Sequence, residues 1–369
     1  MKLTVTTNWA DDFIDRVCEF EEVEWIRGRL YKDEIGSREM SFNNFSKHPT
    51  RKIVEKAIRK IHSYGKKFSY MLDGSCTGNK EYSWEGQEKI RENLRWIDDS
   101  GADSVIVTAP YLVEVIKGQF PRLKVELASS FLVIGEIKRI KYYSGLLGVD
   151  SMVIKNEHNR NFRLLKAFKE AADCKLKLVA NSICLFCCNF LTDHSNVLSH
   201  ISNFTAKVEN FRYYNYICNK IRLDKPEELI KAPFIRPEDI SVYESYGYED
   251  FILDLNSPHT DDAIRTIKAY ISRRYDGNLL EIMSSKGEKA FQNDNGRVEK
   301  DAPYLDNREL DGFIKYFTDG NECHFSICGM ECNYCKNWLK AVHWNNKQSA
   351  EALRAGFQKR IEEIEAGIF

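Results

Sequence analysis

The stretch from Ser104 to Ala128 reads SVIVTAPYLVEVIKGQFPRLKVELA, and it contains the unit from which most of the chain is built. Ser104–Thr108 is a short β-branched run, and Leu112–Gln119 has apolar residues at helical spacing. Lys124–Ala128 then forms a second short apolar run. A strand, a helix and a second strand in this order predict a parallel βαβ unit.

The same alternation extends in both directions from this unit. We expect the other strands at Leu3–Thr7, Val23–Arg27, Phe68–Leu72, Ser151–Lys155, Lys177–Ala180 and Phe251–Leu255. The other main-body helices are expected at Arg51–Ser63, Glu85–Asp98, Gly135–Ser144, Phe162–Ala172 and Asp261–Arg274. Gly101, Gly148 and Gly247 each follow a helix, where a left-handed residue is favoured. Eight such strands predict an α/β fold of the (β/α)8 TIM-barrel type. The runner-up is an open doubly wound sheet, but no GxGxxG follows the first strand.

Composition divides the chain into a barrel and a smaller C-terminal part. Residues 1–283 are the expected barrel domain, in which 181–236 is a long Cys- and His-containing insertion after the seventh strand. Residues 284–300 are polar and are expected to be a linker. Residues 301–369 form a small Cys-rich appendage that ends in an amphipathic helix, Ala350–Ala366.

Charge and hydropathy exclude several classes of protein. The 369 residues contain 54 Lys and Arg against 55 Asp and Glu, so there is no global basic field for nucleic acid, although a local basic groove stays open. No apolar run approaches the ~20 residues of a membrane-spanning helix, and no secretion signal is visible. We therefore expect a cytoplasmic protein without membrane contact.

Eleven cysteines are many for such a chain, and the odd number in a reducing compartment favours metal over disulfides. The first Cys region begins where the seventh strand ends and contains Cys184, Cys187, Cys188 and, further on, Cys218. The carboxyl ends of barrel strands form the catalytic face. These thiols therefore predict an iron–sulfur cluster or zinc at that face.

The second Cys region places Cys323, Cys328, Cys332 and Cys335 within thirteen residues. This density predicts a metal site, because accidental clustering of four thiols is improbable. Only one CxxC knuckle is present, which favours iron–sulfur and leaves zinc as the alternative, with His324 as a spare ligand. One of these thiols can also serve the barrel site.

Further candidates stand near the expected carboxyl ends of strands. Asp73 follows the third strand and Glu157 the sixth, where a carboxylate can act as an acid or a base. Arg236 can hold a carboxylate or phosphate through two parallel hydrogen bonds. We expect these three to be catalytic, although Asp73 can also start a turn and Glu157 can pair with Arg160. The residues expected to bind substrate are Arg27, Cys76, Asn156, Asn181 and His194.

Six short segments share an order and spacing that point to a family. They are Ala128–Ser130, Val153–Glu157, Asn181–Cys184, Phe234–Asp239, Phe251–Asn256 and Ala269–Arg274. Together they resemble the U32 peptidase family, the collagenase-like proteases, over roughly Leu3 to Leu280. The resemblance implies a [4Fe-4S] cluster held by four cysteines, and oxygen-independent hydroxylation of RNA bases or quinone precursors.

Within this resemblance, Cys184 matches the first family cysteine, Cys187 or Cys188 the second, and Cys218 the third. The fourth would fall within Arg236–Ser241, which contains no cysteine. Three thiolates leave one iron of a [4Fe-4S] cluster open for a ligand.

A histidine offers another way to complete the cluster, because His194 and His200 are close in sequence to the cysteines. The family's Gly-Arg after the last strand is replaced by Leu255-Asn256.

The resemblance implies an iron–sulfur enzyme that modifies an RNA base, an aromatic metabolite or a peptide by a hydroxylation-type redox reaction. We expect one or two [4Fe-4S] clusters and an electron donor or partner protein. A metal-stabilised peptidase and a non-catalytic, cluster-bearing accessory protein are the alternatives. No HExxH or GxSxG motif supports the peptidase, although Cys76 leaves a Cys/His dyad open.

Overall fold

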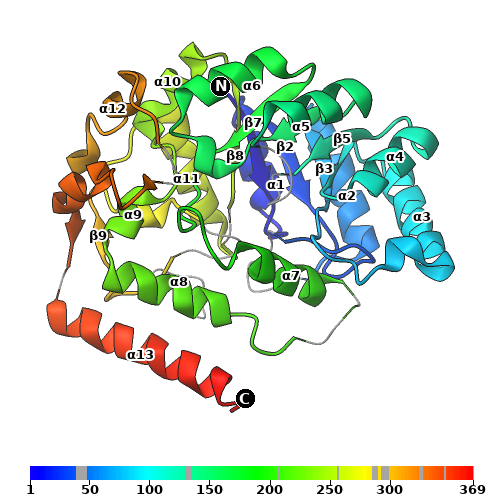
Figure 1. Cartoon of the computed structure of the whole chain (residues 1–369). Coiled ribbons are helices and arrows are strands. Elements are labelled where there is room, and N and C mark those ends of the chain that lie inside the picture. The colour runs from blue at the N-terminus through cyan, green and yellow to red at the C-terminus, as the bar shows by residue number, and fades with distance from the viewer. Residues whose placement is uncertain are drawn as a thin grey trace.

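The barrel is the centre of the computed structural model, which describes residues 1–38, 48–128, 135–203, 205, 208–255, 257–284, 290–291, 299–323, 327–344 and 346–368. Eight parallel strands close in sequence order into one barrel (Figure 1). They are β1 (Lys2–Thr6), β2 (Val23–Gly28), β3 (Lys67–Leu72), β4 (Ser104–Val107), β5 (Lys124–Leu127), β6 (Ser151–Val153), β7 (Lys175–Val179) and β8 (Asp250–Leu253). The predicted (β/α)8 barrel is confirmed, and the open sheet is excluded.

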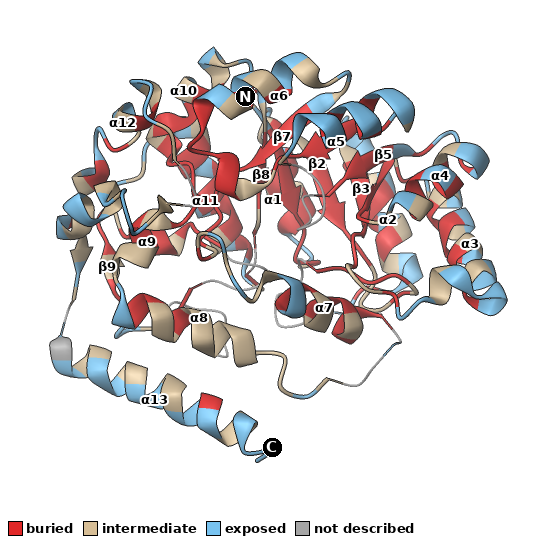
Figure 2. Ribbon diagram, in the orientation of Figure 1, coloured by how far each residue is buried: buried red, intermediate tan, exposed pale blue. Residues whose placement is uncertain are grey.

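Helices surround the barrel and form its outer layer (Figure 1). Those of the main body are α1 (Phe13–Cys18), α2 (Arg51–Ser63), α3 (Trp84–Asp99), α4 (Pro110–Gln119), α5 (Ile137–Lys141), α6 (Phe162–Ala171), α10 (Ile240–Ser245) and α11 (Thr260–Ser272). In α2, the buried residues Val54, Ala57, Ile58 and Ile61 follow helical spacing, so one face is covered and the other is solvated. Figure 2 shows this division between buried strands and half-exposed helices throughout the molecule.

The three glycines expected after helices have left-handed backbones, with φ of +87° at Gly101, +60° at Gly148 and +84° at Gly247. The strand ends differ slightly from the predicted ones. Strand β6 stops at Val153 and β8 at Leu253, so that Lys155 and Asp254 lie in the loops that follow. Both loops open at the carboxyl end of the barrel, where this difference adds two charged side chains to the candidate site.

The interior of the barrel contains a buried ion pair. Lys177 Nζ lies 2.5 Å from Glu126 Oε2, and the two side chains are 4% and 2% exposed. Ser151 donates a hydrogen bond of 3.1 Å to the same carboxylate. These groups lie toward the amino ends of β5 to β7, at the end of the barrel opposite the candidate site.

The insertion after β7 contains three helices, α7 (Leu191–Ser202), α8 (Tyr213–Asp224) and α9 (Glu227–Lys231). The C-terminal part contains α12 (Lys315–Thr318), the two-stranded pair β9 (Tyr304–Leu305) and β10 (Val342–His343), and α13 (Lys347–Glu365). Its apolar side chains share the barrel's core, and those buried there are Leu305, Leu310, Phe313, Phe317 and Ala341. Helix α13 lies along α8 at the edge of the molecule (Figure 1).

Most of the predicted linker, 285–289 and 292–298, lies outside the described residues. None of the helices that the structure describes is both long enough and apolar enough to span a bilayer.

Candidate active site at the barrel mouth

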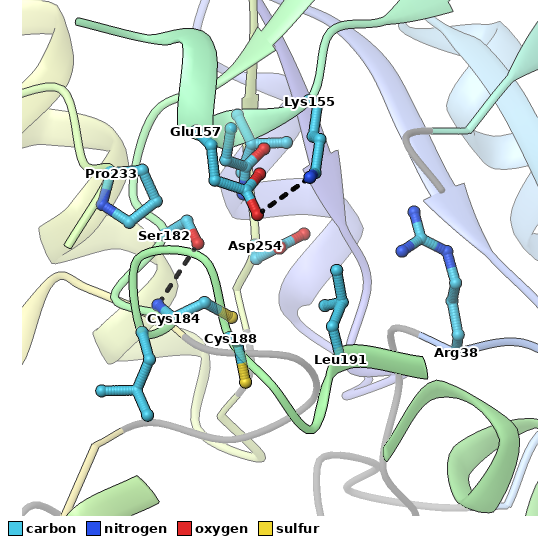
Figure 3. Close-up of a pocket in the computed structure, with 12 residues that line it drawn as sticks. Arg38, Lys155, Glu157, Ser182, Cys184, Cys188, Leu191, Pro233 and Asp254 are labelled. Atoms are coloured by element: carbon cyan, nitrogen blue, oxygen red, sulfur yellow. Dashed lines mark hydrogen bonds and ion pairs between the residues drawn. The ribbon is translucent and has the colours of Figure 1, made fainter. Parts of the chain in front are cut away.

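A pocket of about 60 Å³ opens at the carboxyl ends of the strands (Figure 3). Its walls come from the loops after β2, β6, β7 and β8 and from the start of α7. The lining residues are Arg38, Lys155, Asn156, Glu157, Val179, Ser182, Cys184, Leu185, Cys188, Leu191, Pro233 and Asp254. Chemistry in TIM barrels occurs at this face, because the loops from all eight strands meet there.

The loop after β6 supplies a cation, an amide and a carboxylate to the pocket. Lys155 Nζ lies 3.4 Å from Glu157 Oε1, and the two side chains point toward each other in Figure 3. Asn156 Oδ1 is buried and has no hydrogen-bond partner among the described residues. A buried acceptor of this kind requires a donor, so a bound molecule or a water that donates a hydrogen bond fits here. Asn156 and Glu157 were predicted for the site, whereas Lys155 was not.

Asp254 is held in place from two sides. Arg27 is ion-paired with its carboxylate and also donates a hydrogen bond of 2.9 Å to Thr6 Oγ1. The amide of Asn181 donates to the Asp254 carbonyl at 2.9 Å and accepts from the Asp254 N–H at 2.8 Å. Arg27 and Asn181, predicted to bind substrate, thus contact the residue that lines the pocket. Asp254 itself was missed, although a carboxylate directly after the eighth strand was a usable signal.

Asp73, which follows β3, is fully buried and lies beside Arg38. Arg38 Nε lies 3.7 Å from Asp73 Oδ2, and Arg38 lines the pocket. Cys76 does not line it; its carbonyl accepts a hydrogen bond of 3.0 Å from Asn203, which anchors this loop beside α7. No signal in the sequence marks Arg38, because it lies in the middle of a loop.

Three thiols meet at one wall of the pocket. Cys184 and Cys188 line it from the loop after β7 (Figure 3), and Cys218 comes from α8. Cys218 is hydrogen-bonded to Cys188, and this contact, with burial and the nearby Cys184, raises the pKa of the Cys218 thiol. We call Cys184, Cys188 and Cys218 the mouth thiols.

Cys187 has different neighbours from the mouth thiols. Its backbone is left-handed, with φ of +51°. The pKa of its thiol is raised to about 11, mainly by burial. Glu157 and Cys328 also raise this pKa, whereas Lys155 lowers it. Cys328 belongs to the C-terminal part, so Cys187 lies between the two Cys regions.

The two histidines near these cysteines lie outside the pocket lining. His194, on α7, is 9% exposed and its ring lies 5.6 Å from that of Tyr214, centroid to centroid. Burial lowers the pKa of His200, and the charge of Lys80 lowers it further.

Arg236 lies away from the pocket and is buried against the C-terminal part. Its guanidinium donates to Asn307 Oδ1 at 2.8 Å, to the Asn307 carbonyl at 2.9 Å and to the Leu310 carbonyl at 2.6 Å, and it pairs with Asp311 at 2.6 Å. The structure thus gives the predicted catalytic arginine four contacts that tie residues 307–311 to the barrel.

The side chains at the mouth include potential ligands for a metal ion or a cluster. Among the described residues, no three His, Cys, Asp or Glu side chains are arranged to hold a single metal ion. The mouth thiols are nevertheless gathered, and Arg222 lies beside them, where its charge lowers the pKa of Cys218. Arg222 is 1% exposed, and its Nε has no hydrogen-bond partner in the described part of the chain. A buried cation with a spare donor beside three thiols fits an anionic, sulfur-rich group.

Comparison with known proteins agrees with the barrel fold. No protein-family model matches the chain. The uncharacterized protease MJ1657 of Methanocaldococcus jannaschii is 29% identical over 289 residues, which cover 78% of this chain and 80% of that protein. The solved structure of the U32 peptidase Mk0906 matches with a TM-score of 0.53 and 18% identity, over 69% of this chain and 92% of its own. The comparisons confirm the predicted resemblance to the U32 peptidase family.

Proposed function

We propose that the chain is an iron–sulfur enzyme that carries out a hydroxylation-type redox modification at the barrel mouth. The observation that supports this proposal is the meeting of Cys184, Cys188 and Cys218 at the wall of the pocket. Three thiolates would hold a [4Fe-4S] cluster there and leave one iron without a protein sulfur ligand. A bound cluster supplies one-electron chemistry, which no side chain of the pocket supplies alone.

The pocket favours a polar group as the part of the substrate that enters. A volume of about 60 Å³ admits a small group and excludes a bulky one. Arg38 and Lys155 provide two cations at its rim, and Asn156 provides an acceptor that has no donor among the described residues. The edge of an RNA base or of an aromatic metabolite carries N–H and C=O groups that meet these requirements. A peptide meets them less specifically, because its groups repeat along an extended chain.

Glu157 is the residue that we assign to proton transfer. It is 8% exposed, lines the pocket and lies next to Lys155. A carboxylate in this position can take a proton from a bound substrate and return it. Asp254, fixed by Arg27 and Asn181, then orients the substrate rather than exchanging a proton with it.

A peptidase is the second candidate, and its support comes from the relatives, one of which is named a protease and the other a peptidase. It predicts cleavage of peptides by a metal-free sample under reducing conditions. A third candidate is an accessory protein that carries a cluster for another enzyme. It predicts that the chain binds a cluster but catalyses no reaction by itself, with or without that cluster.

Purification without oxygen, followed by analysis of iron, sulfide and zinc, tests the proposal. We expect a coloured protein with acid-labile sulfide, and we expect Cys184→Ala to lose mouth iron while the barrel stays folded. Cys174→Ala is the matched control, because that thiol lies at the start of the β7 region, far from the pocket lining. Peptide cleavage that survives removal of all metal, or full iron in Cys184→Ala, would refute the iron–sulfur site.

A further inference from the structure

The second Cys region forms a group of its own. Cys323, Cys328, Cys332 and Cys335, here called the C-terminal thiols, lie between α12 and β10. All four are free and partly buried. None of them lines the pocket at the barrel mouth, so the proposed function does not use them.

The backbone around Cys328 folds into a tight turn that brings two of these cysteines together. Gly329 has φ of +82°, and its N–H donates to the Cys332 carbonyl at 3.1 Å. The Met330 and Glu331 N–H groups both donate to the Ile327 carbonyl at 3.1 Å. Cys328 and Cys332 are thereby paired across the turn as partners in a β-bridge.

Cys335 is in the first turn of the 3₁₀ helix Tyr334–Ala341, directly after this turn. Cys323 precedes the turn in the sequence. Burial raises the pKa of Cys323 to about 12 and that of Cys335 to about 11. Cys328 and Cys332 act on both thiols in the same direction, and Cys335 also acts on Cys323. The four sulfurs therefore lie within electrostatic reach of one another.

Two cations accompany the C-terminal thiols. Arg160 lowers the pKa of Cys323 and Cys335, and Lys231 lowers that of Cys328. Arg160 is fixed from behind, because it donates to the Ile230 and Ala232 carbonyls at 2.9 and 2.5 Å. Four thiolates around a divalent ion carry a net charge of −2, which two neighbouring cations offset.

The segment that carries these thiols has little regular secondary structure to stabilise its fold. Between α12 and β10 the described residues form turns and one 3₁₀ helix. Ring contacts hold it to α12, such as Tyr334 stacked on Tyr316 of that helix with centroids 4.0 Å apart. Small segments of this kind commonly depend on a metal crosslink for their fold.

We propose that Cys323, Cys328, Cys332 and Cys335 form a closed four-thiolate site for zinc or an iron–sulfur cluster, separate from the barrel mouth, that fastens the segment Cys328–Ala341 to α9. No three of these side chains, as described, are aimed at one centre. Rotation about the Cα–Cβ bonds, between staggered positions, brings the sulfurs together when metal binds.

Metal analysis of single variants of the full chain tests the proposal. Iron and zinc per chain are measured in wild type, Cys332→Ser, Cys184→Ser and the control Cys174→Ser, all purified without oxygen. We expect Cys332→Ser to lose one metal centre and Cys184→Ser to keep that centre. We also expect limited proteolysis within 319–343 to become about tenfold faster in Cys332→Ser only. The element lost from Cys332→Ser, zinc or iron with sulfide, identifies the group bound.

Cobalt binding gives a readout that does not depend on the folding of Cys332→Ser. A Cys184→Ser/Cys218→Ser double variant keeps all four C-terminal thiols and lacks two mouth thiols. Cobalt(II) added after removal of native metal should produce the intense sulfur-to-cobalt absorbance of a four-thiolate site. Its absence, full metal in Cys332→Ser, or loss of the same single centre from both Cys184→Ser and Cys332→Ser would overturn the proposal. A Cys184→Ser variant with unchanged metal would refute the mouth site alone.

Discussion

Arg27 and Asp254, which are 227 positions apart in the sequence, are ion-paired at the mouth of the barrel. Arg27 lies near the end of β2 and is 2% exposed, while Asp254 follows β8 and lines the pocket. The pair bridges over β1, whose Thr6 accepts a further hydrogen bond from Arg27. One buried cation thus connects three strands at the rim of the candidate site.

Replacement of Arg27 by Met should destabilise the protein strongly. The substitution leaves the Asp254 carboxylate largely buried without its cation, which costs about 3–5 kcal/mol. Urea unfolding of Arg27→Met against wild type measures the loss. The exposed pair Lys315–Asp319 is the control, and Lys315→Ala should cost less than about 1 kcal/mol. Equal effects of the two substitutions would show that the mouth pair is not a structural contact.

Arg236 should be essential for the attachment of the C-terminal part and dispensable in the pocket. Arg236→Met removes four contacts to residues 307–311, and we expect the free energy of unfolding to fall by about 3 kcal/mol or more. Arg236→Lys should recover little, because an ammonium group cannot reproduce the planar fork of donors. Hydrogen exchange of the Tyr304–Asp311 amides should accelerate in both variants. A stable Arg236→Met protein that loses only turnover would instead support a catalytic arginine.

Asp239 should make the protein less stable as the pH rises through the weakly acidic range. Burial raises the pKa of this carboxyl from its ordinary 3.8 to about 6, against the opposing charge of Arg236. Between these values the folded chain binds a proton that the unfolded chain releases, so stability is fully present below pH 4 and falls as the pH approaches 6. The change is on the order of 3 kcal/mol. In Asp239→Asn this fall in stability with pH should be absent. The effect is measured as the difference between the unfolding free energies of wild type and Asp239→Asn at each pH. A constant difference from pH 4 to 7 would contradict the buried, protonated carboxyl.

Helix α13 should steady the helix that carries Cys218. Phe357 of α13 stacks on Tyr216 of α8 with centroids 6.1 Å apart, and Arg354 pairs with Asp224 at 2.7 Å. Loss of the ring in Phe357→Ala removes apolar contact from α8, and we expect faster hydrogen exchange in Tyr213–Asp224 and weaker retention of iron at the mouth. Lys359→Ala is the control, because Lys359 is on the same helix and is 77% exposed. Unchanged exchange in α8 would show that the two helices are independent.

Local sequence patterns were sufficient for the barrel and for part of its mouth. Each strand and helix in the main body has a hydrophobic period that depends only on neighbouring residues, and all eight strands were predicted within a few positions. The glycines after helices were also predicted, because a left-handed backbone is a local requirement. Glu157 and Asn156 were placed at the mouth for a similarly simple reason: they follow a strand of a barrel.

Contacts between distant segments were decided by the tertiary structure alone. Cys187 and Cys188 are adjacent in the sequence, yet Cys188 is hydrogen-bonded to Cys218, while Cys187 has a left-handed backbone and other neighbours, among them Glu157 and Lys155. Arg236 was predicted to be catalytic from its own segment, and its contacts with Asn307 and Leu310, about 70 positions further along the chain, have no local pattern that connects them to it. Closure of the barrel brings the ends of all strands together in space, and this long-range geometry, which periodicity does not encode, determines which side chains share a site.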